Sequence, residues 1–321
     1  MHAKKRPNNA LPGESLHLMK SKIKTNYSLK NLTTIRIGGH ALYYATPSTV
    51  FELKEILNFS IDRNLLFYIL GNGSNVLISD EDFKGIVIKL RGRFEEIIFT
   101  EDDGTVTCGA GAFLMKLGSK IAERGYAGCS YMGVIPGTIG GAVRMNAGTL
   151  EEGEIKDHFL NAQVLDSQTG EIETYALEDM HFGYRKCALS QSKKILFQVT
   201  FRLPQIKEKH QGEAREIINR ILATRRQKHP EIPLNFGSTF KRPAGGKPPG
   251  WYLEQVGMKG MRSGGAMVAE EHANWILNMG NATSQDVKIL ISEGRKRVFE
   301  EFGINLEREV IYLPEDMEAW Q

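Results

Sequence analysis

The stretch GVIPGTIGGAVRMNAG, residues 133–148, limits the possible folds of this chain more than any other segment, because it places five glycines within sixteen residues. Ordering a glycine in a regular element costs about 0.5–1 kcal/mol relative to alanine. Such a dense cluster is typical of backbone that lies close to something flat or charged, although a structural loop with ordinary turns is the alternative. The candidate ligand contacts are Gly133, Pro136, Gly137, Thr138, Gly140, Gly141, Asn146 and Gly148.

A second glycine-rich segment, LGNGSNVLISD, covers residues 70–80. Its short side chains leave backbone N–H groups free to surround a phosphate oxygen, although a tight β-turn is the alternative. It lacks the third glycine of a Rossmann fingerprint, a strand pattern follows it, and the chain contains no Walker A sequence. Together the two segments favour a bound dinucleotide. The candidate phosphate contacts are Gly71, Asn72, Gly73, Ser74 and Asn75.

The length of 321 residues indicates two or three globular domains, because it exceeds the size at which one core grows efficiently. A net charge of +3 does not indicate a nucleic-acid partner, and an anionic small molecule suits it equally well. Cys108, Cys129 and Cys187 lack zinc-ligand spacing and favour a reducing compartment, so we expect a cytoplasmic protein. Residues 1–27 are expected to be a loose leader, and no apolar run approaches the roughly 20 residues of a membrane span.

Hydrophobic periodicity predicts a mixture of helices and strands. A helix is expected after Pro47 with Thr49 in a capping-box position, and the change to polar, charged residues after Pro204 favours a domain boundary there. The other expected helices lie near 114–125, 217–222 and 283–302, and the expected strands are 65–70, 76–79, 85–90, 105–112, a hairpin over 161–175 and 304–313.

Three polar side chains are candidates for chemistry, and each also has an ordinary structural interpretation. Ser238, in NFGSTFKRP, is not in a Gly-x-Ser-x-Gly elbow and by itself indicates a turn or cap. Arg185, in FGYRKC, and Glu309, in EREV, belong to residue types that are most often solvated surface groups. His272 and Asn274, in EEHANW, lack HExxH spacing, so we expect no metal site.

Seven motifs occur in an order that resembles one enzyme family. They are TTIRIGG, LGNGSNVLISD, GVIPGTIGGAVRMNAG, FGYRKC, GSTFKRP, GGAMVAEEHANWILNMGNAT and GINLEREV. The resemblance covers about residues 28–314 and is to the UDP-N-acetylenolpyruvoylglucosamine reductases, flavoenzymes of peptidoglycan precursor synthesis. A single one of these motifs would be weak evidence for the family, whereas seven in the same order are specific evidence.

The resemblance implies an α+β fold with an FAD-binding domain of the vanillyl-alcohol-oxidase (PCMH) type over residues 28–206, in two subdomains of about 28–97 and 98–206. A smaller α+β substrate-binding domain would occupy 207–321, and its last strand is expected to return toward the FAD domain. NADPH would be the co-substrate and a UDP-sugar the substrate. FAD would be non-covalent, because neither glycine-rich segment contains a His or Cys. We expect a monomer or weakly associating chain without membrane or nucleic-acid partners.

The resemblance also implies roles for single residues. Ser238 would be a general acid that protonates the substrate carbon next to the one that receives hydride from the flavin. Arg185 would hold the carboxylate of the enolate in a bidentate fork, and Glu309 would hydrogen-bond there if protonated. The two glycine-rich segments would contact FAD. The substrate-side positions are Tyr184, Lys228, Lys241 and Arg242, whose cations would meet the diphosphate and carboxylate.

Two segments depart from the family pattern, namely the acidic residues 149–154 and the proline-containing residues 244–253, so their contacts stay open. No candidate for the tyrosine-bearing insertion of some members occurs between Tyr184 and Ser238, which indicates the shorter lineage. Two other functions stay open at this point. One is an FAD-linked alcohol or hydroxy-acid oxidase or dehydrogenase of the same fold, and the other is a non-catalytic nucleotide-binding protein.

Overall fold

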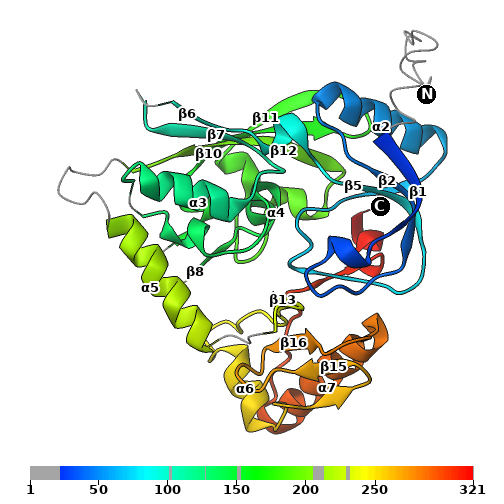
Figure 1. Cartoon of the computed structure of the whole chain (residues 1–321), viewed down its shortest axis with the longest axis vertical. Coiled ribbons are helices and arrows are strands. Elements are labelled where there is room, and N and C mark those ends of the chain that lie inside the picture. Colours follow the sequence, from blue (N-terminus) through cyan, green and yellow to red (C-terminus); the bar gives the residue numbers. More distant parts are fainter. Residues whose placement is uncertain are drawn as a thin grey trace.

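The structure is a computed structural model that describes residues 22–100, 103–126, 128–149, 153–204, 213–228 and 232–320. Three lobes meet around a common centre (Figure 1). The first two lobes lie side by side, and the long helix α5 (Glu213–Lys228) leads from the second lobe to the third. Each lobe combines helices with strands, which confirms the predicted α+β class. None of the helices within these ranges is both long and apolar enough to span a bilayer.

The first lobe is a mixed sheet in the order β1-β2-β5-β3, with helix α2 packed on it. The helix begins where the Thr49 hydroxyl accepts a hydrogen bond from the Glu52 N–H at 3.2 Å, as predicted. Its apolar side, which includes Leu53 and Ile56, packs against Ile86 of the sheet. The elements are β1 (Ile23–Ser28), β2 (His40–Ala45), α2 (Val50–Asp62), β3 (Leu66–Ile69), β4 (Val76–Ile78) and β5 (Phe83–Ile88).

Strand β1 corrects the expected leader, which was placed over residues 1–27. Residues 23–28 pair with β2 in an antiparallel ladder, and the ring of Tyr27 stacks on that of Tyr44 at 4.1 Å between centroids. Ladder hydrogen bonds and aromatic contact together order this segment. Residues 1–21 of the expected leader lie outside the described residues.

The second lobe is an antiparallel sheet in the order β11-β10-β12-β7-β6. Helices α3 and α4 bury Leu117, Ile121 and Val143 in a core with strand residues such as Val199 and Phe201. The elements are β6 (Ile97–Thr100), β7 (Thr105–Gly109), α3 (Leu114–Glu123), α4 (Ile139–Arg144), β8 (Gly148–Thr149), β9 (Gly153–Glu154), β10 (Phe159–Asp166), β11 (Ile172–Ala176) and β12 (Lys194–Arg202).

The third lobe is a small antiparallel sheet in the order β13-β16-β15-β14 with helices α6 and α7. Helix α7 starts with a reciprocal capping box between Thr283 and Asp286 and ends at Gly303, whose φ of 66° is left-handed, in agreement with the predicted start and stop. The elements are β13 (Asn235–Ser238), α6 (Pro249–Gln255), β14 (Arg262–Ser263), β15 (Ala266–Val268), β16 (Trp275–Asn278) and α7 (Ser284–Phe302).

The strand predicted over 304–313 forms only at its end, as β17 (Ile311–Leu313). The preceding residues instead cross from the third lobe toward the first, and Glu309 N–H bonds to Thr239 O on the way. Strand β17 then pairs in parallel with β4. The C-terminus therefore lies against the first lobe (Figure 1). The predicted domain boundary near residue 207 lies outside the described residues and stays a prediction.

Short 3-10 helices complete the described chain. They occupy Lys30–Leu32, Gly92–Glu95, Ser130–Gly133, Ile155–Asp157, Glu178–Met180, Ala188–Gln191 and Glu315–Trp320.

Candidate active site

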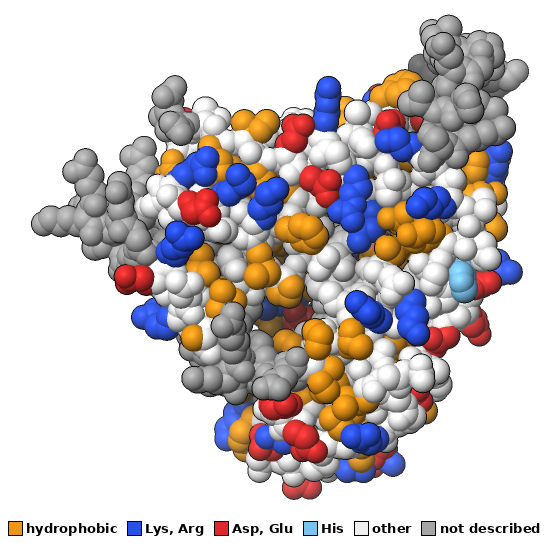
Figure 2. Space-filling view, viewed as in Figure 1, with side chains coloured by type: hydrophobic (Ala, Val, Ile, Leu, Met, Phe, Trp, Pro, Cys, Tyr) orange, Lys and Arg blue, Asp and Glu red, His pale blue; other side chains and the backbone are white. Residues whose placement is uncertain are grey.

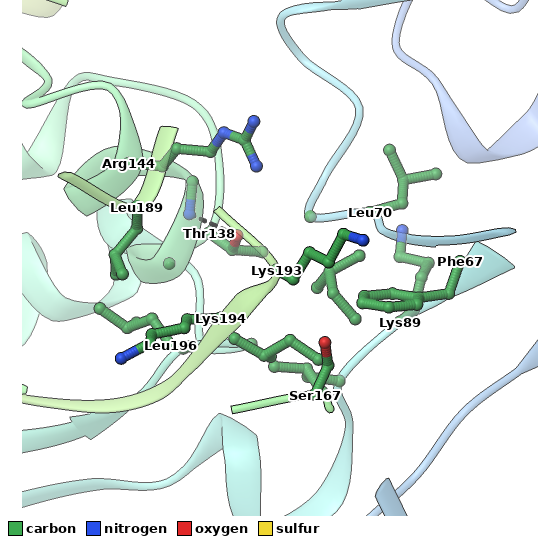
Figure 3. A pocket seen from close by; sticks show the side chains of 18 of the residues that line it. Phe67, Leu70, Lys89, Thr138, Arg144, Ser167, Leu189, Lys193, Lys194 and Leu196 are labelled. Carbon is green, nitrogen blue, oxygen red and sulfur yellow. Dashed lines mark hydrogen bonds between the residues drawn. The ribbon is translucent and has the colours of Figure 1, made fainter. Parts of the chain in front are cut away.

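A cavity of about 400 Å³ lies between the first and second lobes, and both glycine-rich segments line it. Gly71 and Asn72 come from the turn after β3, while Thr138, Gly140 and Gly141 come from the start of α4. Figure 3 shows the lining side chains, which reach the cavity from both lobes. The two segments identified in the sequence thus form one site although about 60 residues separate them.

The glycines in the first segment are needed for close packing. A Cβ atom on Gly71 would lie 2.6 Å from Thr138 Oγ1, so the two segments touch at this point. Gly73 has a φ of 66°, and a Cβ atom there would lie 2.3 Å from Leu32 O. Any side chain at either position would have to displace its neighbours.

The polar groups of this cavity fit the diphosphate of FAD. Gly71 and Asn72 line the cavity, and none of the described residues accepts a hydrogen bond from their backbone N–H groups, so these two donors are available to phosphate oxygens. The cations Lys89, Arg144 and Lys193 also line the cavity. In Figure 3, Lys89 and Lys193 enter it from opposite walls. Burial lowers the pKa of Lys89 to about 8, with repulsion from Arg91 as a second cause.

Some predicted cofactor contacts have other partners in this structure. Gly133 faces α5, where a Cβ atom would meet Ile218 Cδ1 at 2.7 Å. The Asn146 side chain is buried and bonds to Gly183 O and Lys156 N–H, while Gly148 lines a second cavity. Ser74 Oγ donates to Pro136 O at 3.1 Å, which joins the first segment to the second near Gly137. Asn75 Nδ2 donates to Glu309 O at 3.2 Å.

The second cavity, of about 280 Å³, contains the three residues predicted to carry chemistry, Ser238, Arg185 and Glu309. Residues from the second lobe, the third lobe and the crossing segment before β17 line it together. Figure 2 shows the surface hollowed where the upper lobes meet the lower one. The second glycine-rich segment lines the first cavity with Gly140 and the second with Gly148, so it passes from one cavity to the other.

Arg185 is held in place by protein groups on both of its edges. Its Nε donates to Glu309 Oε1 at 2.9 Å, and its NH groups approach Asn146 O at 3.5 Å and Gly148 O at 3.3 Å. The backbone of Arg185 has a φ of 55°, which is strained for a residue with a side chain. The guanidinium has five N–H donors, so two are left for a ligand.

Glu309 is an internal carboxyl group with one close cation. Burial raises its pKa above the ordinary value of 4.5, and the charge and hydrogen bond of Arg185 oppose that shift, as does the more distant Lys241. A carboxylate arriving beside Arg185 would add a negative charge and raise the pKa of Glu309 further. The position therefore favours a carboxyl group that takes up a proton when an anionic ligand binds.

Ser238 is the last residue of β13 and is half-buried. Its hydroxyl makes no hydrogen bond to any described residue, although it lines the cavity together with Arg185 and Glu309. No base is paired with it among the described residues, which agrees with the sequence argument against a nucleophilic serine. The hydroxyl is therefore available to donate to a ligand.

The structure describes the side-chain surroundings of three of the four predicted substrate-side residues. Tyr184 and Arg242 line the second cavity, and Arg242 N–H donates to the Tyr184 hydroxyl at 3.3 Å. Lys241 does not line this cavity, and its amine is paired with Glu307. Lys228 ends α5, and its side chain lies outside the described part of the structure.

Sequence reasoning missed several residues that line the two cavities. His272 lines the second one, and burial lowers its pKa, so the ring is neutral at pH 7. In sequence, EEHANW resembles a metal motif only weakly and gives no sign of a cavity-lining role, and the described residues contain no group of three or more His, Cys, Asp or Glu side chains that could hold a metal ion. Lys89 and Lys193 were missed because a single lysine in or beside a strand has no distinguishing pattern.

The fold, the two cavities and the comparison with known families together define a flavin-dependent oxidoreductase. Residues 41–176 match the FAD binding domain family, and residues 229–313 match the family described as UDP-N-acetylenolpyruvoylglucosamine reductase, C-terminal domain. The UDP-N-acetylenolpyruvoylglucosamine reductase of Caldicellulosiruptor bescii is 37% identical over 290 residues, which are 90% of each chain. That of Clostridioides difficile is 35% identical over 305 residues, which are 93% of this chain and 96% of that protein.

A solved structure extends the likeness to three dimensions. The crystal structure of the reductase from Thermus caldophilus matches with a TM-score of 0.75 and 32% identity, and the match covers 91% of this chain and 98% of that one. The chain belongs to the UDP-N-acetylenolpyruvoylglucosamine reductase family. The predicted resemblance and cofactor class are confirmed, while the assignment to a shorter lineage stays a prediction.

Proposed function

We propose that this protein reduces the enolpyruvyl ether of UDP-N-acetylglucosamine to UDP-N-acetylmuramate with bound FAD and NADPH, a step of peptidoglycan precursor synthesis. The observation that carries the proposal is the meeting of Ser238, Arg185 and Glu309 in one cavity, joined to the flavin cavity by the second glycine-rich segment. FAD, when bound, would supply the redox chemistry, which is the transfer of hydride from NADPH to a substrate carbon.

The residues of the first cavity hold the cofactor. The N–H groups of Gly71 and Asn72 and the cations Lys89, Arg144 and Lys193 would bind the diphosphate, while Gly140 and Gly141 would let the main chain approach it. No described lining residue of this cavity is a cysteine or histidine, which agrees with non-covalent binding.

Arg185 binds the carboxylate of the substrate. When hydride reaches the outer carbon of the enolpyruvyl group, negative charge spreads from the neighbouring carbon into this carboxylate, and the two unused N–H groups of Arg185 stabilise it. The contacts of the guanidinium with Glu309 Oε1 and with the backbone oxygens of Asn146 and Gly148 hold it in one orientation before substrate arrives. Glu309 accepts the hydrogen bond from Arg185 Nε and, once protonated, its second oxygen would donate a hydrogen bond to the developing charge.

Ser238 donates the proton that completes the reaction. Its hydroxyl has no partner among the described residues that would compete for the proton. A serine hydroxyl is a weak acid, but an enolate is a strongly basic acceptor, so the transfer is feasible when the two groups are aligned. Tyr184 and Arg242, on the same cavity wall, are placed to contact the sugar nucleotide.

The state of the cysteines supports a cellular location for this chain. The described cysteines are all unpaired and buried, which supports a reducing compartment and hence the cytoplasm. We infer a monomer or weakly associating chain, and sedimentation of the purified protein would test this.

Two optical measurements test the proposed function. The purified protein should be yellow, should be bleached by NADPH, and should regain colour rapidly when the enolpyruvyl sugar nucleotide is added without oxygen. A colourless protein would favour the non-catalytic alternative. Rapid re-oxidation by oxygen, with no response to the sugar nucleotide, would instead favour an oxidase of the same fold.

A further inference from the structure

The TTIRIGG motif, residues 33–39, has no part in the mechanism above, yet Thr34 lies between the two halves of the site. Its N–H donates to Gly73 O at 3.1 Å, and its Oγ1 lies 2.5 Å from Asn235 O and 3.3 Å from Gly73 O. A hydroxyl has one proton, so the shorter contact with Asn235 takes it. Thr34 therefore bonds to the first glycine-rich segment through its backbone and to β13 through its side chain.

Asn235 is the first residue of the strand that ends at Ser238. The pairing of β13 with β16 is irregular between these two residues, with partners at Leu277 and Trp275. A ladder with a register shift restrains a strand less than a continuous one. The Thr34 hydroxyl supplies a restraint at the beginning of this irregular stretch.

The contact between the 32–34 segment and the first glycine-rich segment is tight. A Cβ atom on Gly73 would lie 2.3 Å from Leu32 O and 2.7 Å from Thr33 Cα, so the two backbones touch. The same glycine-rich segment also reaches the crossing segment that carries Glu309, because Asn75 Nδ2 donates to Glu309 O and Ile311 N–H donates to Asn75 O. Hydrogen bonds thus connect the first glycine-rich segment to the strand that ends at Ser238, through Thr34, and directly to the segment that carries Glu309.

We propose that Thr34 is a positioning residue that couples the flavin phosphate segment to β13 and so holds the Ser238 hydroxyl at a fixed place relative to the flavin. The proposal rests on the proposed role of Ser238 as proton donor. Thr34 touches neither reacting group in this scheme, so its effect is confined to the step in which Ser238 gives up its proton.

The test compares three variants of the FAD-loaded enzyme. Thr34→Val keeps the shape of the side chain but removes the hydroxyl, and it should slow re-oxidation by substrate about tenfold while NADPH reduces the flavin at the wild-type rate. Thr34→Ser should restore re-oxidation to within about twofold. Thr33→Val is the matched control, because the Thr33 hydroxyl bonds to Ile37 O in its own segment, and it should leave both rates unchanged.

A double variant separates positioning from general destabilisation. In the Ser238→Ala background, Thr34→Val should add less than a twofold further slowing, because the group that it positions is already absent. Three results would overturn the proposal. They are a further tenfold slowing of re-oxidation in the double variant, equal slowing of both half-reactions in Thr34→Val, and the same re-oxidation defect in Thr33→Val. If substrate re-oxidises Ser238→Ala slowly but Thr34→Val at the wild-type rate, the proposed role of Thr34 is wrong and that of Ser238 stands. If substrate re-oxidises Ser238→Ala at the wild-type rate, both the proton-donor role of Ser238 and the positioning role of Thr34 are wrong.

Discussion

Arg185 and Glu309 form an ion pair of 2.9 Å across 124 positions of sequence. Their side chains are only 20% and 15% exposed, so the pair is screened less than a surface contact and can hold the guanidinium in one orientation. The pair connects the second lobe with the segment that crosses from the third lobe to β17. It therefore forms only when all three lobes are assembled.

Arg185→Lys should impair re-oxidation by substrate more than reduction by NADPH. Lysine keeps the charge but loses the planar fork and the Nε contact with Glu309, so the developing carboxylate charge is stabilised less. We expect substrate turnover to fall roughly 10²–10³-fold. Stopped-flow absorbance resolves the two half-reactions, and equal slowing of both would show that Arg185 is structural or serves both ligands.

Gly141→Val should abolish FAD binding while the protein still folds. A Cβ atom at Gly141 has only Thr138 Oγ1 within 4 Å, at 3.5 Å, so the side chain has room in the protein but lies in the cofactor cavity. Gly140→Val is the comparison, because its Cβ atom would lie 3.0 Å from Ala110 Cβ and should cost stability as well. Flavin content and thermal melting measure the two effects. Normal flavin content in Gly141→Val would show that this segment is only a structural turn.

FAD should bind more weakly as the pH rises above about 8. Burial lowers the pKa of Lys89 to about 8, so above that pH the free protein has a neutral amine and must take up a proton to pair with the diphosphate. The dissociation constant should increase by up to about tenfold per pH unit over this range. Lys89→Met should bind FAD more weakly at pH 7 and lack this added pH dependence. Parallel pH profiles for the two proteins, measured by flavin fluorescence, would contradict the assignment.

Local signals in the sequence predicted much of the fold. The helix starts at Thr49 and Thr283 and the stop at Gly303 depend on neighbours within a few residues, and the structure contains all three. The strand predicted from residue 304 formed only from Ile311, because the preceding segment crosses between lobes. Apolar residues alternate in the same way in an extended segment that connects two lobes and in a strand, so this pattern does not separate the two.

The candidate site was predictable only in part. The resemblance alone indicates Ser238, Arg185 and Glu309, since their meeting depends on contacts between distant segments. The bond from Thr34 to Asn235 spans 201 positions, and no local pattern indicates it. His272 lines the second cavity, but a lone buried histidine looks the same in sequence whether it packs in a core or lines a cavity.

The central claim is that Ser238 gives a proton to the substrate carbon, and Ser238→Ala removes that proton while leaving the flavin cavity unchanged. Ser238→Cys is the companion variant, since a thiol is a proton donor at nearly the same place and should recover part of the rate.

The most direct measurement is the rate at which the enolpyruvyl sugar nucleotide re-oxidises the NADPH-reduced Ser238→Ala enzyme under anaerobic stopped flow. The account predicts flavin reduction at a near-normal rate and re-oxidation slowed 10²–10⁴-fold, the usual contribution of a general acid. Re-oxidation of Ser238→Ala at the wild-type rate would contradict the account and leave Ser238 as a loop residue.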